Sequence, residues 1–210
     1  MTDARGRSEF LEKQNVSRET LTRLDRYAAL LEKWNPAINL VSKSTLADLW
    51  TRHFLDSAQI FDLCPPGARV WADLGSGGGF PGLVIAILAA GRAAGIRVTL
   101  VESDVRKATF LNTVAREVGV AVDIRPERIE SLPPLAADVL SARALAPLDQ
   151  LLAFAARHLA VGGVALFSKG AAHADELAKA RMNWAFSVEE TQSKTDPNAV
   201  ILGIKGLAHV

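Results

Sequence analysis

Cysteine is nearly absent from this chain of 210 residues, which contains one, Cys64. A single cysteine forms neither an internal disulfide nor a cysteine metal site, so we expect a reducing, cytoplasmic location. Long apolar runs are also missing, because the longest one, residues 83–90, is far shorter than a bilayer span. The polar N-terminus lacks the apolar segment of a signal peptide. We therefore expect no association with a membrane.

An excess of either charge is absent too. The 24 Lys and Arg residues nearly balance the 23 Asp and Glu residues, for a net charge of +1. This balance argues against a nucleic-acid binder that relies on bulk positive charge, although it leaves room for a local basic patch. Hydrophobic residues make up 49 % of the chain, which is enough for one full core with a short appendage.

The first third of the chain has a helical pattern. Residues 1–16 are polar, and we expect them to fray. Ser17 and Ser44 are predicted N-caps of two amphipathic helices, the first ending near Asn35-Pro36. A Pro-Pro-Gly turn then separates residues 1–66, a predicted helical extension, from a predicted domain at residues 67–210.

From residue 69 onward, short apolar strands alternate with helices. The predicted strands are residues 70–74, 98–102, 121–125, a fourth starting at 139, 164–167, 186–191 and 200–204. The predicted helices are residues 83–88, 107–118, 148–159 and 174–182. This alternation is typical of a Rossmann-like α/β fold, and the ending predicts a seven-stranded, mostly parallel sheet with a reversed last strand.

A glycine-rich loop joins the first predicted strand to the first helix of this domain. It runs Asp73-Leu74-Gly75-Ser76-Gly77-Gly78-Gly79-Phe80-Pro81-Gly82. Glycine is needed where the backbone takes a positive φ or approaches a ligand closely, so the loop is predicted to face a ligand at the carboxyl end of the sheet. The alternative is a merely flexible connection.

Two ligands fit this loop. Gly77-x-Gly79-x-x-Gly82 satisfies the dinucleotide fingerprint, with Glu102 at twenty residues beyond. The competing pattern, Asp-x-Gly-x-Gly-x-Gly from Asp73, resembles the signature of S-adenosylmethionine enzymes. In that reading Glu102 accepts both ribose hydroxyls; otherwise it is a solvated charge at a strand end. No segment remains for the second domain of a hydride-transfer enzyme, which favours S-adenosylmethionine.

Several further segments together resemble the glucose-inhibited division protein B (GidB) methyltransferases. In the family's order, over roughly residues 30–170, they are Trp34-Asn35-Pro36-Ala37-Ile38-Asn39-Leu40, Arg52-His53-Phe54-Leu55-Asp56-Ser57, the glycine loop with its Phe80-Pro81-Gly82 ending, Glu102-Ser103 with Lys107 and Phe110-Leu111, Ser141-Ala142-Arg143-Ala144, and Lys169-Gly170. The resemblance implies a class I S-adenosylmethionine methyltransferase fold and methylation of a guanine N7 in 16S ribosomal RNA.

The resemblance also implies a set of cofactor contacts. They are Gly75, Gly77, Phe80, Glu102, Ile129, Glu130 and Arg143. Ile129 could instead be plain core, and Arg143 a surface arginine. Candidate RNA contacts are Arg52, His53, Lys43, Lys169 and Arg106, each of which could be an ordinary solvated charge. His53 and Asp56 share a helix face and could equally buttress the helical extension against the domain.

The sequence lacks the motifs of two other kinds of base methylation, which is compatible with methylation of guanine N7. After the fourth strand it has no Asp/Asn-Pro-Pro-aromatic motif of exocyclic-amine methylation, and Cys64 lies too early to act as a nucleophile. Guanine N7 carries a free lone pair, so we expect catalysis by proximity and orientation, with no catalytic acid or base and no metal. The target should lie in a loop or distorted region, since N7 is hidden in A-form RNA.

We therefore expect a cytoplasmic, monomeric enzyme that acts on 16S rRNA, within the small ribosomal subunit or an assembly intermediate. Three alternatives stay open: a methyltransferase of the same fold with another target, a ribosome-assembly factor that senses S-adenosylmethionine without turnover, and a dinucleotide reductase.

Overall fold

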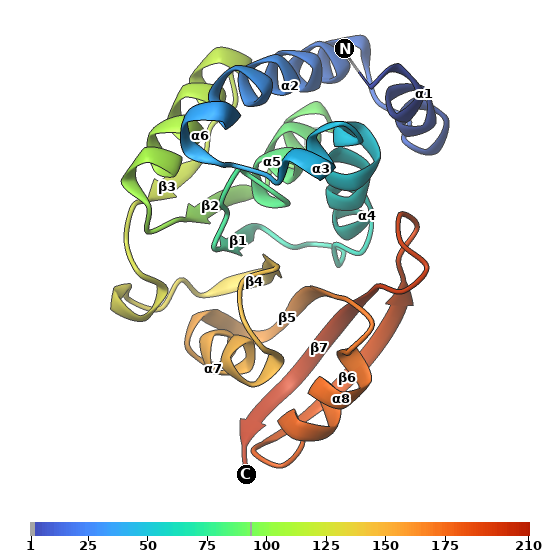
Figure 1. Ribbon diagram of the computed structural model, residues 1–210. Coiled ribbons are helices and arrows are strands. Elements are labelled where there is room, and N and C mark those ends of the chain that lie inside the picture. Colours follow the sequence, from blue (N-terminus) through green and yellow to red (C-terminus); the bar gives the residue numbers. More distant parts are fainter. Residues whose placement is uncertain (1–2, 93) are drawn as a thin grey trace.

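A seven-stranded sheet with helices on both faces forms the centre of the molecule (Figure 1), seen in a computed structural model that describes residues 3–92 and 94–210. The strands are β1 (Val70–Leu74), β2 (Arg97–Val101), β3 (Asp123–Arg125), β4 (Ala137–Arg143), β5 (Leu159–Lys169), β6 (Trp184–Gln192) and β7 (Val200–His209). Their order is β3-β2-β1-β4-β5-β7-β6. Because β7 runs antiparallel to both of its neighbours, β5 and β6, the predicted reversed last strand is confirmed.

The helices divide between the two faces of the sheet. Their bounds are α1 (Ala4–Lys13), α2 (Arg18–Ile38), α3 (Lys43–Leu46), a π-helical turn η1 (Trp50–Leu55), α4 (Asp56–Phe61), α5 (Gly82–Gly91), α6 (Val105–Val118), a 3-10 turn η2 (Ile129–Ser131), α7 (Leu148–His158) and α8 (His173–Ala180). In the described part of the chain, no helix combines the length and the apolarity needed to cross a membrane.

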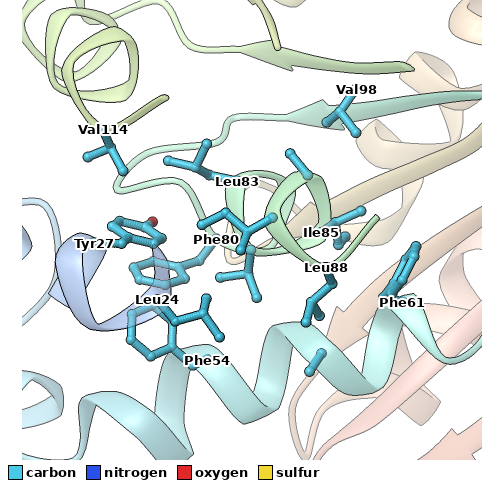
Figure 2. Packing of buried hydrophobic residues seen from close by; sticks show 14 of the residues in the cluster. Leu24, Tyr27, Phe54, Phe61, Phe80, Leu83, Ile85, Leu88, Val98 and Val114 are labelled. Atoms are coloured by element: carbon cyan, nitrogen blue, oxygen red, sulfur yellow. The ribbon is translucent and has the colours of Figure 1, made fainter. Parts of the chain in front are cut away.

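Alternating side chains of the strands supply two cores. Trp71, Val98 and Val139 belong to a cluster with α2, η1, α4, α5 and α6, and Leu140 and Phe167 belong to a second with α7 and α8. Figure 2 shows how the helical extension enters the first cluster, where aromatic side chains of α2 and η1 meet residues of the glycine loop and α5. The helices before β1 and one face of the sheet thus share the first apolar cluster.

The expectation that residues 1–16 fray is wrong for residues 4–13, which form α1; Met1 and Thr2 lie outside the described residues. Asp3 caps this helix by accepting a hydrogen bond from the Gly6 amide at 2.9 Å. Phe10 is fully buried, with its ring centroid 5.3 Å from that of Trp50. One large aromatic anchor therefore holds a helix whose other side chains are mostly polar.

Two helix ends also differ from those predicted from the sequence. The helix α2 continues through Pro36 to Ile38, although a proline has no N–H for the i→i−4 hydrogen bond, and Asn39 ends it with φ +48°. The N-cap of the next helix is Ser42 rather than Ser44, since the Ser42 hydroxyl accepts the Thr45 amide at 3.2 Å. What the sequence presents as one second helix is α3, η1 and α4 in succession.

Candidate active site

A cavity of about 580 Å³ opens at the carboxyl ends of β1, β2 and β4. Ligands of open α/β sheets bind at this edge, where the strand order reverses. The cavity wall contains all seven residues predicted as cofactor contacts: Gly75, Gly77, Phe80, Glu102, Ile129, Glu130 and Arg143. The structure thus brings four separated segments together, while their contact with a cofactor stays a prediction.

The glycine loop is a fixed surface rather than a slack connection. Gly75 has φ +66°, and a Cβ there would lie 2.5 Å from Leu145 Cδ1. Gly77 has φ +56°, with no heavy atom nearer to an added Cβ than one at 3.8 Å, so its backbone borders open space. Beneath the loop, the Tyr27 hydroxyl of α2 donates to the Gly78 carbonyl. The helical extension therefore helps to set the shape of the loop.

Asp73, the first residue of the glycine motif, lies beneath the cavity and is fully buried. Its carboxylate accepts from the Gly82 amide at 3.1 Å and from the Ser141 hydroxyl at 2.7 Å. Burial raises the pKa of Asp73 to about 6, although these hydrogen bonds favour the charged form. Asp73 therefore fastens β1 to β4 and to the start of α5.

Glu102 directly follows β2, and its carboxylate binds the glycine loop and the residues before α6. One carboxylate oxygen accepts from the Gly77 amide at 2.8 Å, and the other accepts from the Asp104 amide at 2.8 Å. An ionised carboxylate has about four acceptor positions, so two bonds leave capacity for hydroxyl groups in the cavity. This arrangement ties the predicted ribose acceptor to the glycine loop, which a solvated charge at a strand end would not do.

Ile129 and Glu130 lie on the turn η2 between β3 and β4. Ile129 is buried in the second apolar cluster and also lines the cavity, so the core and cofactor interpretations are both compatible with its position. Glu130 is exposed at the rim, 3.6 Å from Arg128 Nη2.

Arg143, at the end of β4, is directed toward the helical extension and is not a free surface arginine. Its Nη1 donates to the Arg52 carbonyl and to Asp56 Oδ2, both at 3.0 Å. Its Nη2 lies 2.7 Å from His53 Nδ1, and its guanidinium carbon is 5.3 Å from the centre of the Phe80 ring. Arg143 thereby joins the strand, the extension and the glycine loop.

His53 is a buried neutral side chain. Since a guanidinium only donates, Nδ1 must accept from Arg143, and Nε2–H then donates to the Thr45 hydroxyl at 2.9 Å. Burial, followed by the positive charges of Arg143 and Arg52, lowers the pKa of His53 to about 3. For His53 and Asp56, these contacts agree with the buttress interpretation of the Arg52–Ser57 run.

The four remaining basic candidates differ in their surroundings. Arg52 is exposed and forms an ion pair with Asp196 at 3.1 Å, and Lys43 is exposed on α3. Arg106 pairs with its near neighbour Asp104 at 3.0 Å. Lys169, in contrast, is buried: its ammonium lies 2.6 Å from Glu176 Oε2 and 2.9 Å from the Ala146 carbonyl. Arg52, Lys43 and Arg106 are therefore exposed at the surface, whereas Lys169 is buried.

A second cavity of about 420 Å³ adjoins the first. Residues from α3, η1 and α4, from the ends of β4 and β5, from α8 and from the loop between β6 and β7 line it. Among them, Glu176, Thr195 and Asp196 had no signal in the sequence, because the elements that carry them are brought to the site only by the tertiary fold.

The comparisons with known proteins agree with the fold and name a family. The family model described as "GidB: rRNA small subunit methyltransferase G" matches residues 20–200. A protein of Ruegeria sp. (strain TM1040) with the name "Ribosomal RNA small subunit methyltransferase G" is 54 % identical over 100 % of both chains. A protein of the same name from Ruegeria pomeroyi is 56 % identical, over 93 % of this chain and 96 % of its own length.

Solved structures show the fold. A TehB-like S-adenosylmethionine-dependent methyltransferase from Corynebacterium glutamicum matches with a TM-score of 0.53 and 19 % identity, over 71 % of this chain and 86 % of its own. A ribosomal protein L11 methylase from Lactobacillus delbrueckii matches with a TM-score of 0.54 and 16 % identity, over 71 % and 76 %. The predicted class I methyltransferase fold is thus confirmed.

Proposed function

This chain belongs to the GidB family, the rRNA small subunit methyltransferases G, and on that premise we propose that it transfers a methyl group to N7 of one guanine in 16S rRNA. The donor is S-adenosylmethionine. The observation that carries the proposal is the cavity in which the glycine loop, Glu102, η2 and Arg143 converge.

The residues of this cavity fit S-adenosylmethionine. The open backbone at Gly77 lets a ligand approach the loop closely, and the free acceptor positions of Glu102 suit the two ribose hydroxyls. Ile129 offers an apolar surface for the adenine ring. When bound, S-adenosylmethionine supplies a methyl group on a positively charged sulfur. The chain's own residues position that group and shape the approach of the acceptor.

The site supports methylation of an atom that already has a lone pair. Both nitrogens of His53 are engaged, so this histidine cannot take a proton from a substrate. Glu102 is held by two backbone amides and faces the predicted ribose position. Guanine N7 needs no deprotonation, and holding it in line with the methyl group is catalysis by proximity. The proposed reaction therefore needs only the positioning of its two substrates, and these residues can provide that.

For the RNA, we propose that the helical extension at residues 1–66 forms one side of the entrance to a methyltransferase domain at residues 67–210. Exposed Arg52 and Lys43 would contact phosphates, whereas buried His53 and Lys169 would shape the entrance from within. A monomer acting on the small subunit or an assembly intermediate is our proposal for the working form.

The test is methyl transfer to 16S rRNA prepared without this modification, presented as naked RNA and as 30S subunits, followed by mass mapping of the nucleosides. We expect one 7-methylguanosine, formed on the better of the two substrates. A methyl group on another atom would contradict the N7 assignment. Binding of S-adenosylmethionine without transfer to either substrate would instead favour a sensor.

A further inference from the structure

We propose that the second cavity receives the target guanine and that Glu176 recognises its Watson–Crick edge. This inference rests on the proposed function. Four residues, His53, Arg143, Ala144 and Ala146, line both cavities, so a base in the second one borders the cofactor cavity directly. RNA bases are read when they are splayed out of a stack and hydrogen-bonded along their edges.

The charges of the second cavity suit a neutral base better than a phosphate. Its three cationic side chains are each paired with a carboxylate, as Arg52 with Asp196, Arg143 with Asp56 and Lys169 with Glu176. His53, on the same wall, is neutral. Three positive and three negative groups leave no net attraction for an anion, but they leave hydrogen-bonding capacity for a heterocycle.

Among these three carboxylates, Glu176 is the one with an oxygen that accepts no hydrogen bond from the described residues. Both oxygens of Asp56 accept bonds, from Arg143 and from Gln59 and Thr195, and both oxygens of Asp196 accept bonds, from Arg52 and Asn198. In Glu176, one oxygen, Oε2, accepts from both Lys169 and the Leu148 amide. The other, Oε1, accepts no hydrogen bond from any residue that the structure describes.

A free carboxylate oxygen favours guanine because guanine has hydrogen-bond donors on its Watson–Crick edge. Guanine presents N1–H and an exocyclic amine on the side of the purine remote from N7, so N7 at the shared wall leaves both donors facing deeper into the second cavity. Glu176 lines only that cavity. Adenine has an acceptor at N1, which a carboxylate repels. Ser168, on the same wall, has a buried hydroxyl with no partner among the described residues, and this hydroxyl can donate to guanine O6.

The first experiment compares the unchanged protein with Glu176→Gln in methyl transfer to unmodified 30S subunits. The substitution keeps the shape of the side chain and an acceptor for the Leu148 amide, but it removes the charge. We expect kcat/KM to fall tenfold to a hundredfold, the factor that a charge-assisted hydrogen bond provides, with S-adenosylmethionine affinity by calorimetry within twofold. Glu189→Gln, which changes an exposed carboxylate of β6 outside both cavities, is the matched control and should keep full activity.

A second variant separates base recognition from the pairing of Lys169. In Lys169→Met/Glu176→Gln no buried cation lacks its counter-ion, so a purely structural Glu176 predicts recovered activity. Base recognition predicts that the double variant stays at least tenfold slow. Full activity of Glu176→Gln, or recovery in the double variant, overturns the inference while the proposed function stands. An unchanged protein that methylates neither subunits nor RNA overturns both.

Discussion

Replacing His53 with alanine should destabilise the protein while its exposed neighbour tolerates the same change. The alanine removes the acceptor for Arg143 Nη2 at 2.7 Å, the donor to Thr45 and a ring whose centroid lies 4.7 Å from that of Phe80. A lost hydrogen bond to a charged group costs about 1.5–3 kcal/mol, and the vacated volume adds to it. We expect a loss of about 3 kcal/mol, or roughly 6–12 °C in Tm for a chain of this size.

Arg52→Ala is the matched control. Its side chain is 44 % exposed, and a surface ion pair such as that with Asp196 contributes about 0–1 kcal/mol. Thermal unfolding of both variants gives the stability comparison. In addition, Arg52→Ala should weaken RNA binding, reduce its dependence on salt and leave cofactor affinity unchanged, because a positive charge at the proposed RNA entrance is lost and Asp196 is left without its partner.

The pH dependence makes the His53 prediction sharper. The pKa of His53 is about 3 in the folded protein and near 6.5 in the unfolded chain. Between these two pH values the unfolded chain carries a proton on His53 that the folded protein does not. The contribution of His53 is therefore present above about pH 6.5 and is lost on acidification, by up to about 1.4 kcal/mol for each pH unit. The stability gap between the unchanged protein and His53→Ala should shrink as pH falls below 6.5. A gap that is absent, or equal at pH 7 and pH 5, would refute the assignment of His53 as a buried neutral buttress.

Three other predictions concern the cofactor and the loop beneath it. S-adenosylmethionine or its demethylated product should raise the Tm, as any ligand of the folded state does, whereas NAD and NADP should not; stabilisation by NADP alone would overturn the cofactor. Glu102→Ala should lower cofactor affinity about tenfold to a hundredfold in calorimetry, since it removes a charged acceptor of two hydroxyls; unchanged affinity in a folded variant would leave Glu102 as a loop support only. Asp73→Asn should remove part of the pH dependence of the free energy of unfolding. Because the pKa of Asp73 in the folded protein, about 6, lies above its usual value, protonated Asp73 stabilises the fold fully below about pH 4. This contribution is lost as the pH rises through 6. Parallel stability–pH curves for Asp73→Asn and the unchanged protein would contradict this.

The sequence predicted best what depends on local pattern. The strand β1, which ends at the glycine loop, has its predicted bounds, whereas β5 begins and β7 ends five residues outside the predicted range. What it missed depends on distant partners. The helix α1 is polar apart from Phe10, and nothing near Phe10 in sequence announces Trp50 as its contact. Likewise, a proline usually ends a helix, but here the last turn continues past Pro36 to Ile38.

The candidate site divides in the same way. The glycine loop and Glu102 follow strand ends, so their convergence could be predicted from the parallel order of the sheet. The partners of Arg143 lie about ninety residues away in sequence, and no local signal reveals that its guanidinium is directed to His53 and Asp56. The burial of Lys169 depends on Glu176 in the same way, since a lysine is expected at the surface unless it is paired.

The loop between β6 and β7 contacts α4, which precedes the first strand. The Lys194 amide donates to Gln59 at 2.7 Å and the Thr195 hydroxyl donates to Asp56 at 2.7 Å, and in Figure 1 the tip of this hairpin lies next to the helix. The first cavity is lined by residues no later than Phe154, whereas the second needs the chain as far as Ala199. During synthesis from the N-terminus, every lining residue of the first pocket therefore leaves the ribosome before the second can be closed. The residues that would hold the methyl donor are therefore all synthesised before the last residues that line the proposed base cavity.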